Sequence, residues 1–354
     1  MTAQNYNVIG LMSGTSLDGI DLAQLSFSLS AGKWTYAIGA TATVPYTSAW
    51  IDQLKMAVDF TPAQLTELNT KYTQLLGTTI YDFIAQNQLS QIDAVCSHGH
   101  TILHQPQNGF TLQIGNLPEL AEYCQQKVVC DFRVQDVQLG GQGAPLVPIG
   151  DRYLFADYNY CLNLGGFSNI SYEQNGQRLA FDISAVNTVL NFYAAQQGWN
   201  YDDRGSFAQS GTLHGPLFEA LNALPYYQLS PPKSLGFEYV KSTLLPLIDS
   251  FAIDTASKMH SFTEHVAFQI AQALPTQSGN MLVTGGGAYN DFLIQRMKHY
   301  LPYVQIEIPS QKTIEYKEAL IFGLLGVLRL RNEINVLHSV TGARKDHCAG
   351  KVFE

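Results

Sequence analysis

The spacing of apolar and polar residues predicts two strands and a helix in the N-terminal part of the chain. Residues 8–12 form a short apolar run, and residues 22–29 alternate in the manner of a half-buried strand. A segment rich in glycine and hydroxyl side chains separates them, which predicts a strand, a turn and a second strand. A helix is expected to begin at Thr61-Pro62, because a hydroxyl can cap the first turn and proline suits the first helical position. Apolar side chains then recur every three or four positions, at Leu65, Leu68, Tyr72, Leu76, Ile80 and Phe83.

The same order of elements recurs in the second half. Residues 160–164 are apolar, two glycines follow, and residues 170–172 resume the strand pattern. We predict further strands at 94–97, 127–131, 179–183 and 281–284, and helices at 187–197, 263–274, 290–300 and 315–331. Two strand–turn–strand units favour two related α/β halves, although glycine hairpins are so common that the pattern alone leaves coincidence equally open. The expected boundary is the GGQGAP segment within residues 140–157.

Composition narrows the class of protein. The length of 354 residues predicts two domains. A hydrophobic fraction of 46% with only 14% charged residues excludes a disordered chain. The net charge of −9, from 20 basic and 29 acidic residues, argues against nucleic acid or a membrane surface as a partner, because both need basic surface. A phosphorylated small substrate stays compatible with this charge, since one local patch can override the overall sign.

The cysteines predict reduced, mostly buried thiols. Their odd number, wide spacing and lack of a CxxC pair argue against a disulfide framework and a structural zinc site. They are Cys96, Cys124, Cys130, Cys161 and Cys348. The first residues lack the basic and apolar regions of a signal peptide, and the apolar stretch 319–328 is about half the length of a membrane span. We therefore expect a cytoplasmic protein with no membrane partner.

The turn after the first strand is the strongest candidate for chemistry. It consists of Gly14, Thr15, Ser16, Leu17, Asp18, Gly19, Ile20 and Asp21. The small residues of this turn allow a ligand to approach the backbone. The hydroxyl and backbone N–H groups of the turn can donate to phosphate oxygens. Asp18 and Asp21 could hold Mg²⁺, which one or two carboxylates usually bind together with phosphate and water. The turn has neither the GK[ST] of a P-loop nor a GxGxxG pattern, and an ordinary hairpin turn is the alternative.

Two further strand ends are candidates. Asp182 ends a predicted strand, where carboxylates commonly face the ligand crevice of α/β proteins, and it could act as a general base. Capping of the next helix is the alternative. Gly285, Gly286 and Gly287 follow another strand and could let an adenosine ring pack on the backbone, or could simply form a tight connection.

Several charged or titratable side chains remain ambiguous. His98, His100 and His104 lie in SHGHTILH, which we interpret as a strand end and loop whose histidines contact a substrate or pack internally. A zinc site is the alternative, although no carboxylate completes a recognisable ligand spacing. Arg133 and Asp136 form either a ligand contact, in which the guanidinium grips a carboxylate, or an internal ion pair. Glu318 suits the beginning of an apolar helix.

Taken together, these segments resemble the anhydro-N-acetylmuramic acid kinases, a family of the sugar kinase/Hsp70/actin superfamily. The matching segments follow the family order from residue 9 to about residue 345. They are GLMSGTSLDGID, SHGHTILHQP, LQIGN, VVCDFRVQDVQLGGQGAPLVPIGD, LNLGGFSNI, AFDIS, YDDRGSFAQSG, PPKSLGFEY, LVTGGGAYN and SVTGARK.

The resemblance implies two duplicated actin-like ATPase lobes of ribonuclease H-like α/β fold, each with a mixed five-stranded sheet and helices, and an ATP cleft between them. Residues 1–150 and about 315–354 would form the first lobe, and residues 151–314 the second. GTSLDGID would be the first phosphate hairpin and TGGG the adenosine-side loop. The second phosphate hairpin would comprise Gly165, Gly166, Ser168 and Asn169.

The reaction implied by the resemblance opens the 1,6-anhydro bridge of 1,6-anhydro-N-acetylmuramic acid with water and phosphorylates O6, using ATP and Mg²⁺. The product would be N-acetylmuramic acid 6-phosphate, in peptidoglycan recycling. The family's catalytic aspartate falls on Asp182. Arg133, Asp136 and Glu318 correspond to sugar-side residues, and His98 is a further candidate for contact with the sugar. The family also suggests a homodimer.

The chain departs from the family pattern in two places. Many members read FDTGPGN around the catalytic aspartate, whereas this chain reads FDISAVN, which keeps Asp182 and Asn187 but replaces the glycine-rich loop with bulkier residues. His100 stands where glutamine is common. The altered loop leaves open a related sugar kinase with a shifted substrate, or a sugar- or nucleotide-binding sensor with weak turnover. An actin-like polymer has little support.

Overall fold

The computed structural model describes residues 4–14 and 16–354. The described chain forms two compact units. The first contains the residues up to Leu154 together with Tyr316–Glu354, and the second contains Phe155–Glu315. Each unit has its own sheet and its own buried core, and each is described here by itself.

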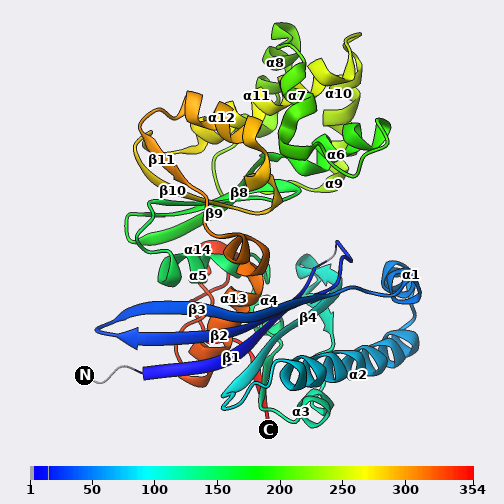
Figure 1. Ribbon diagram of the computed structural model, residues 1–354, viewed down its shortest axis with the longest axis vertical. Helices are drawn as coiled ribbons and strands as arrows, with labels where there is room; N and C mark the ends of the chain where they lie inside the picture. Colours follow the sequence, from blue (N-terminus) through cyan, green and yellow to red (C-terminus); the bar gives the residue numbers. More distant parts are fainter. Residues whose placement is uncertain (1–3, 15) are drawn as a thin grey trace. The chain divides into compact units, whose positions relative to one another are not determined.

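The first unit is built from a mixed sheet and flanking helices (Figure 1). Its strands are β1 Gln4–Ser13, β2 Ile20–Ser30, β3 Lys33–Val44, β4 Ala94–Gln105, β5 Phe110–Ile114, β6 Val128–Cys130 and β12 Lys351–Phe353. Its helices are α1 Ser48–Met56, α2 Pro62–Gln86, α3 Glu119–Cys124, α4 Val134–Gln138, α5 Val147–Leu154, most of α13 Gln311–Leu330, and α14 His338–Thr341.

The order of the first sheet is β12-β6-β4-β1-β2-β3, and β5 pairs with β4. β1 and β2 are antiparallel, as are β2 and β3, whereas β4 runs parallel to β1 and β6 runs parallel to β4. The hairpin of β1 and β2 therefore lies beside parallel strands whose carboxyl ends point the same way as the end of β1.

Helices α2 and α13 cover opposite faces of this sheet (Figure 1). A Cβ atom on Gly10 of β1 would overlap the carbonyl oxygen of Ala319 in α13, so glycine lets the helix lie directly on the strand. Neighbouring strand residues face opposite sides. Accordingly, Ile9 and Leu11 face away from α13 and share a buried core with Leu76 of α2.

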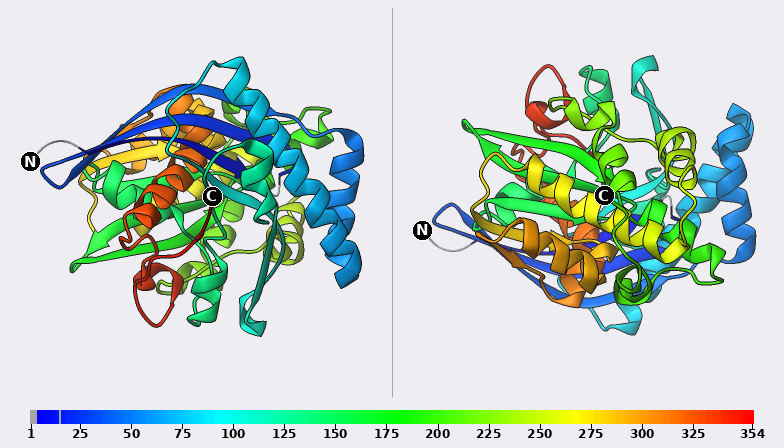
Figure 2. Two further views of the ribbon diagram at one scale, coloured as in Figure 1. Left: turned by 90° about the horizontal axis from the view of Figure 1, so that it is seen from below. Right: turned by 90° about the horizontal axis from the view of Figure 1, so that it is seen from above.

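The second unit repeats this arrangement. Its strands are β7 Tyr160–Leu164, β8 Phe167–Gln174, β9 Gln177–Ala185, β10 Gly279–Thr284 and β11 Val304–Glu307. Its helices are α6 Asn187–Gln196, α7 Ser206–Ser210, α8 Gly215–Asn222, α9 Phe237–Tyr239, α10 Leu245–Asp249, α11 Thr255–Ala273 and α12 Asp291–Tyr300. α11 and α12 lie side by side in both further views and pack into the core of this unit (Figure 2).

The two sheets share one topology. The second sheet has the order β11-β10-β7-β8-β9, with β7, β8 and β9 antiparallel in turn and β10 and β11 parallel to β7. The first sheet has this same order and the same directions at β6-β4-β1-β2-β3. The predicted duplication of two mixed α/β halves is confirmed. The expectation of five strands in each is wrong for the first, because among the described residues β5 and β12 enlarge that sheet to seven strands.

Most predicted elements are confirmed, with two corrections. The helix at Thr61-Pro62 has the expected cap, reinforced by Gln64, whose side chain accepts from the Thr61 N–H at 2.9 Å. The SHGHTILH segment is not a strand end and loop, because β4 continues to Gln105 past an irregularity that Gly99 accommodates at φ +73°. The helix predicted to begin at residue 263 begins at Thr255, capped by Asp254.

The prediction that the thiols are mostly buried is confirmed. All five thiols are free, and only Cys348 is not fully buried. In the described part of the chain, no helix is both long and apolar enough to cross a bilayer.

Candidate functional site

The first glycine-rich hairpin joins β1 to β2. The Leu17 N–H donates to the Gly14 carbonyl oxygen at 3.3 Å, and Leu17 adopts a left-handed φ of +63°. A Cβ atom on Gly19 would lie 2.5 Å from the carbonyl oxygen of Val44, so glycine allows the hairpin to sit against the end of β3. Thr15, the remaining hydroxyl residue of the predicted phosphate hairpin, lies outside the described residues.

The side chains of this hairpin divide between solvent and core. Ser16 and Asp18 are exposed, whereas Ile20 is buried in the core of the first unit, so only its backbone is available to a ligand. Asp21 is partly buried and accepts from the Thr43 hydroxyl at 2.6 Å. Among residues 4–14 and 16–354, no three or more His, Cys, Asp and Glu side chains gather as a metal site. Two carboxylates suffice for Mg²⁺ where phosphate oxygens and water complete its shell.

The second hairpin joins β7 to β8, and its predicted residues face different ways. Gly166 is exposed, and its carbonyl oxygen accepts from the Val186 N–H at 2.8 Å. Ser168 is fully buried and its hydroxyl lies 3.0 Å from that of Ser184, so its side chain stabilises the sheet instead of facing solvent. Asn169 is exposed and is the cross-strand partner of Asp182.

Asp182 lies beside a bulge near the end of β9. The register with β8 passes from the Ser168–Ser184 pair to the Asn169–Asp182 pair, which leaves Ile183 as the extra residue. Bulges re-aim neighbouring side chains and are frequent next to active sites. The Asp182 side chain is partly accessible.

Two residues of the segment 226–235 hold Asp182 by hydrogen bonds. The Leu235 N–H donates to Asp182 Oδ2 at 2.9 Å, and the Tyr226 hydroxyl donates to the Asp182 carbonyl oxygen at 2.7 Å. Burial raises the pKa of the Asp182 carboxyl, and the Leu235 hydrogen bond opposes that rise. A carboxylate made more basic and fixed through one oxygen is suited to accept a proton at the other. Lys233 lies nearby, its Nζ 4.8 Å from the centre of the Tyr226 ring.

The residues expected to form a bulkier loop after Asp182 instead continue β9 to Ala185 and pack inside the second unit. Ile183, Ala185 and Val186 all belong to its hydrophobic core. Asn187, the first residue of α6, donates through Nδ2 to the Leu164 carbonyl oxygen at 3.2 Å. The residues that depart from the family pattern are thus absorbed by core packing.

The triple glycine packs onto the end of β7. A Cβ atom on Gly285, at φ +81°, would lie 2.7 Å from Asn163 Oδ1 and 2.8 Å from the Leu164 backbone. A Cβ atom on Gly287 would lie 2.7 Å from Leu164 Cβ. A Cβ atom on Gly286 would meet nothing nearer than Asn187 Nδ2, at 4.0 Å. Gly285 and Gly287 therefore permit close packing, and only Gly286 is open towards a ligand.

Gly286 lines a cavity of about 600 Å³ that lies wholly in the second unit. The side chains around it are mixed in character: Asn187, Leu190, Asn191, Tyr201, Asp202, Asp203, Arg204, Ala288, Tyr289, Asn290, Asp291 and Ile308. At its rim, Arg204 forms an exposed ion pair with Asp291 at 2.8 Å. This volume is within the usual range for a small-molecule or cofactor site.

In the first unit, His98 orients Arg133. The Arg133 Nε–H donates to His98 Nε2 at 2.9 Å, and its NH1 group donates to the Gly143 carbonyl oxygen at 2.6 Å. Burial and the Arg133 charge hold the pKa of His98 well below its usual value, so the ring is neutral and can accept this hydrogen bond. Burial lowers the pKa of Arg133 to about 10, which leaves the guanidinium charged at neutral pH.

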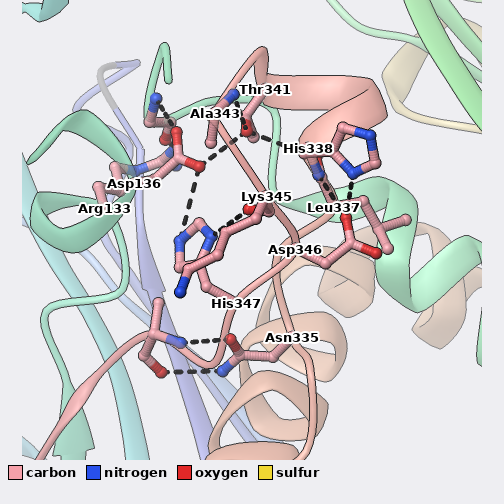
Figure 3. Close-up of polar contacts among 12 residues, drawn as sticks. Arg133, Asp136, Asn335, Leu337, His338, Thr341, Ala343, Lys345, Asp346 and His347 are labelled. Carbon is pink, nitrogen blue, oxygen red and sulfur yellow. Dashed lines mark hydrogen bonds and ion pairs between the residues drawn. The ribbon is translucent and has the colours of Figure 1, made fainter. Parts of the chain in front are cut away.

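Asp136 has no solvent-exposed surface and binds protein groups (Figure 3). Its Oδ2 accepts from the Gly143 N–H at 2.6 Å, and its Oδ1 accepts from the Thr341 hydroxyl at 2.7 Å. His347 Nε2 lies 3.6 Å from Oδ1. Asp136 therefore connects the GGQGAP segment to the C-terminal SVTGARK segment. Of the two alternatives, this arrangement favours an internal structural contact over direct contact with a ligand.

Glu318 lies in α13 and retains solvent-accessible surface. Desolvation by the surrounding protein raises the pKa of its carboxyl, whereas the Arg133 charge lowers it. Asp21 of the first hairpin adds a repulsive contribution. The first unit thus places Glu318 in the same electrostatic environment as Arg133 and Asp21.

Several residues at these sites were not predicted from the sequence. Leu235 and Tyr226, which hold Asp182, were not among the candidates, because Leu235 acts through its backbone N–H and Tyr226 binds a backbone oxygen. Leu235 lies in the family motif PPKSLGFEY, whereas Tyr226 precedes it. The cavity side chains Tyr201 and Tyr289 lie in the family motifs YDDRGSFAQSG and LVTGGGAYN, but their residue type did not mark them, because an aromatic residue in a loop is usually packing. The motif YDDRGSFAQSG was also the available indication of Arg204.

The chain matches the family model described as anhydro-N-acetylmuramic acid kinase over residues 6–354. Curated proteins of that name are similar to it over their full length. The one from Variovorax paradoxus is 35% identical, with 98% of each chain covered. The one from Pseudomonas fluorescens is 33% identical, again with 98% of each covered, and the one from Actinobacillus pleuropneumoniae serotype 5b is 32% identical, with 100% of each covered. The chain belongs to the anhydro-N-acetylmuramic acid kinase family.

Proposed function

We propose that this protein is an ATP-dependent kinase that opens 1,6-anhydro-N-acetylmuramic acid with water and phosphorylates its O6, in peptidoglycan recycling. The observation that carries the proposal is Asp182. In a chain whose full length matches the kinase family, this carboxylate is accessible at a strand end, made more basic by burial, and fixed through one oxygen.

The nucleotide is held by the glycine-rich segments. Backbone N–H groups and hydroxyls of the GTSLDGID hairpin, together with the hairpin around Gly165, Gly166 and Asn169, donate to phosphate oxygens. The adenosine occupies the cavity beside Gly286, where the open backbone lets a flat ring approach. Asp18 and Asp21 would hold Mg²⁺ together with phosphate oxygens and water, and the bound ion would supply positive charge against the phosphates.

Asp182 is the general base. It takes a proton from water as that water attacks C1, and the C1–O6 bond of the anhydro bridge breaks. O6 leaves with the bond's electron pair and attacks the γ-phosphorus, so the bond to the β-phosphate oxygen breaks and ADP departs. The proton ends on Asp182, and positioning supplies much of the rate enhancement.

The sugar is contacted by the first unit. Arg133 offers a planar fork of donors suited to a carboxylate, which muramic acid carries, and Glu318 accepts from sugar hydroxyls. His98 and Asp136 act through Arg133 and the GGQGAP segment as positioning residues. We propose in addition that the protein is a cytoplasmic homodimer, as the family resemblance suggests. Sedimentation of the purified protein would test the dimer.

The Asp182→Asn variant tests the proposed function. It keeps the size of the side chain but removes the base, so we expect ADP release from Mg-ATP and the anhydro sugar to fall by at least about a hundredfold. Nucleotide binding, measured by calorimetry, should stay at the wild-type level. The matched control is Asp254→Asn in the same unit, which retains a good helix cap and should keep wild-type turnover.

Wild-type turnover by Asp182→Asn would remove the role given to that carboxylate. Binding of both ligands by the wild-type protein without ADP release would favour a sensor over a kinase. Turnover with a different sugar, and none with the anhydro sugar, would identify a related sugar kinase.

A further inference from the structure

A buried chain of polar side chains begins at the first glycine-rich hairpin. Ser13 Oγ lies 2.6 Å from the Tyr46 hydroxyl and 2.7 Å from His100 Nδ1, and the Tyr46 hydroxyl lies 2.5 Å from that of Tyr72. Each of the four residues is at most 9% exposed. None of them has a part in the chemistry described above.

The fold brings these groups together from four separate elements. Ser13 is the last residue of β1, His100 lies in β4, Tyr46 follows β3, and Tyr72 lies in α2. Between the pairs Leu11–Ser97 and Ser13–His100 the register of β1 and β4 shifts by one residue. Gly99 makes the shift possible with its φ of +73°, and His100 is thereby aligned with the end of β1.

One assignment of protons uses every hydroxyl. Tyr72 donates to Tyr46, Tyr46 donates to Ser13, and Ser13 donates to His100 Nδ1, which places the histidine proton on Nε2. Burial lowers the pKa of His100 to about 4, so the ring is neutral at physiological pH and can accept. Burial also raises the pKa of Tyr46 and Tyr72, so both keep their donor protons.

The chain of hydroxyls reaches both ends of the hairpin. Ser13 directly precedes Gly14, where the hairpin begins. At the other end, Gly19 packs against Val44 and Pro45, the two residues that precede Tyr46. Tyr46 thus connects the residue before the hairpin to the segment against which the hairpin ends.

We propose that Ser13, Tyr46, Tyr72 and His100 are positioning residues that hold the first hairpin in the geometry required to bind the phosphates of ATP. The inference rests on the proposed function, because it assumes that the hairpin binds nucleotide. Donors fixed in advance bind phosphate without first losing conformational freedom, so loosening the base of the hairpin weakens nucleotide binding.

Towards Ser13, His100 acts as an acceptor. A glutamine side chain carries an acceptor oxygen that can replace Nδ1. The position therefore requires an acceptor for Ser13, and not the charge of a histidine.

Two pairs of variants test the proposal, with the dissociation constant of Mg-ATP measured by calorimetry and both KM values measured by ADP release. Tyr46→Phe should weaken Mg-ATP binding at least about fivefold and leave the KM for the sugar unchanged. The control Tyr160→Phe removes the hydroxyl of another buried tyrosine, bonded to the Thr276 carbonyl oxygen at 2.8 Å, and should leave both KM values unchanged. His100→Leu should weaken Mg-ATP binding as Tyr46→Phe does, and His100→Gln should restore it.

A purely structural role would lower the thermal midpoint of Tyr46→Phe and Tyr160→Phe alike without altering Mg-ATP affinity, and that result would overturn the proposal. Equal Mg-ATP affinity of His100→Leu and His100→Gln would also overturn it. A wild-type protein that does not bind Mg-ATP contradicts the proposed function as well. Variants with unchanged affinity in an active enzyme contradict only this inference.

Discussion

At the scale of single residues, similar side chains have different tasks because of their surroundings. Asp182 and Asp136 are both aspartates that the family resemblance connects with the reaction. Asp182 keeps accessible surface and one protein donor on its carboxylate, whereas Asp136 has no exposed surface and donors on both oxygens. A proton acceptor needs access to its substrate. Access therefore distinguishes the candidate base from the positioning residue.

The triple glycine leads to a prediction at this scale. Gly285→Ala should lower the free energy of unfolding by about 2 kcal/mol, because the new Cβ meets the Leu164 backbone in a left-handed conformation. Gly286→Ala has space for its Cβ and should change that free energy by less than about 0.5 kcal/mol, while weakening ATP binding. Urea unfolding and calorimetry of both variants provide the measurement. Equal loss of stability in the two would contradict it.

At the scale of elements, the contact between α13 and the first sheet depends on missing side chains. A Cβ atom on Gly323 would overlap Leu25 Cδ1, and one on Gly326 would overlap the Cys96 sulfur. The helix carries glycines where it faces β2 and β4, which is why it packs closely there despite the lower helix propensity of glycine. The apolar pattern of residues 315–331 predicts the helix, but the glycines within it show significance only when the facing strands are known.

This close contact predicts that substitutions at Leu25 and Gly323 have non-additive effects on stability. Gly323→Ala should destabilise the protein by about 2 kcal/mol through overpacking, and Leu25→Val by about 1 kcal/mol through lost burial. The double variant should be more stable than the sum of these effects by about 1 kcal/mol, because valine lacks the Cδ1 atom that the new methyl group meets. Urea unfolding of the three variants measures the coupling, and strict additivity would show that the two sites do not compete for space.

At the scale of the whole molecule, each unit encloses a neutral histidine. Burial lowers the pKa of His100 in the first unit to about 4 and that of His265 in the second to about 3. His265 Nδ1 lies 2.7 Å from Asn222 Oδ1, and its side chain has no exposed surface. In each unit, folding therefore opposes protonation of a buried imidazole.

These histidines predict loss of stability on acidification. In the unfolded chain a histidine binds its proton near pH 6.5, so between about pH 6.5 and the lowered folded value the unfolded state holds more protons. Their contribution is full above pH 6.5 and is lost as the pH falls towards 4 for His100 and towards 3 for His265. Between pH 6 and 5, His265→Gln should reduce the slope of the free energy of unfolding against pH by about 1 kcal/mol per pH unit.

Urea unfolding at several pH values measures this slope. The exposed His299, changed to glutamine, is the matched control and should keep the wild-type slope. Parallel curves for the wild-type protein and His265→Gln would show that the buried ring does not resist protonation.

Local elements, the duplicated strand–turn–strand units and the family can all be read from the amino-acid sequence. These features depend on neighbours a few residues apart: the Thr61 cap, the apolar period of α2, and the glycines between β1 and β2 and between β7 and β8. The continuation of β4 past Gly99 was not predicted, because a glycine between histidines resembles a loop until partner strands supply its hydrogen bonds.

The contacts of the candidate side chains depend on the folded arrangement of distant segments. Thr341 is 205 residues from Asp136, and His100 is 87 residues from Ser13, yet each pair is joined by a hydrogen bond. The same holds for Ser168, whose residue type suited phosphate but whose hydroxyl lies against Ser184 on the neighbouring strand. Sequence pattern reports periodicity along the chain, whereas burial and hydrogen-bond partners follow from the packing of distant segments. For that reason the chemistry was readable in the sequence, and the positioning of that chemistry was not.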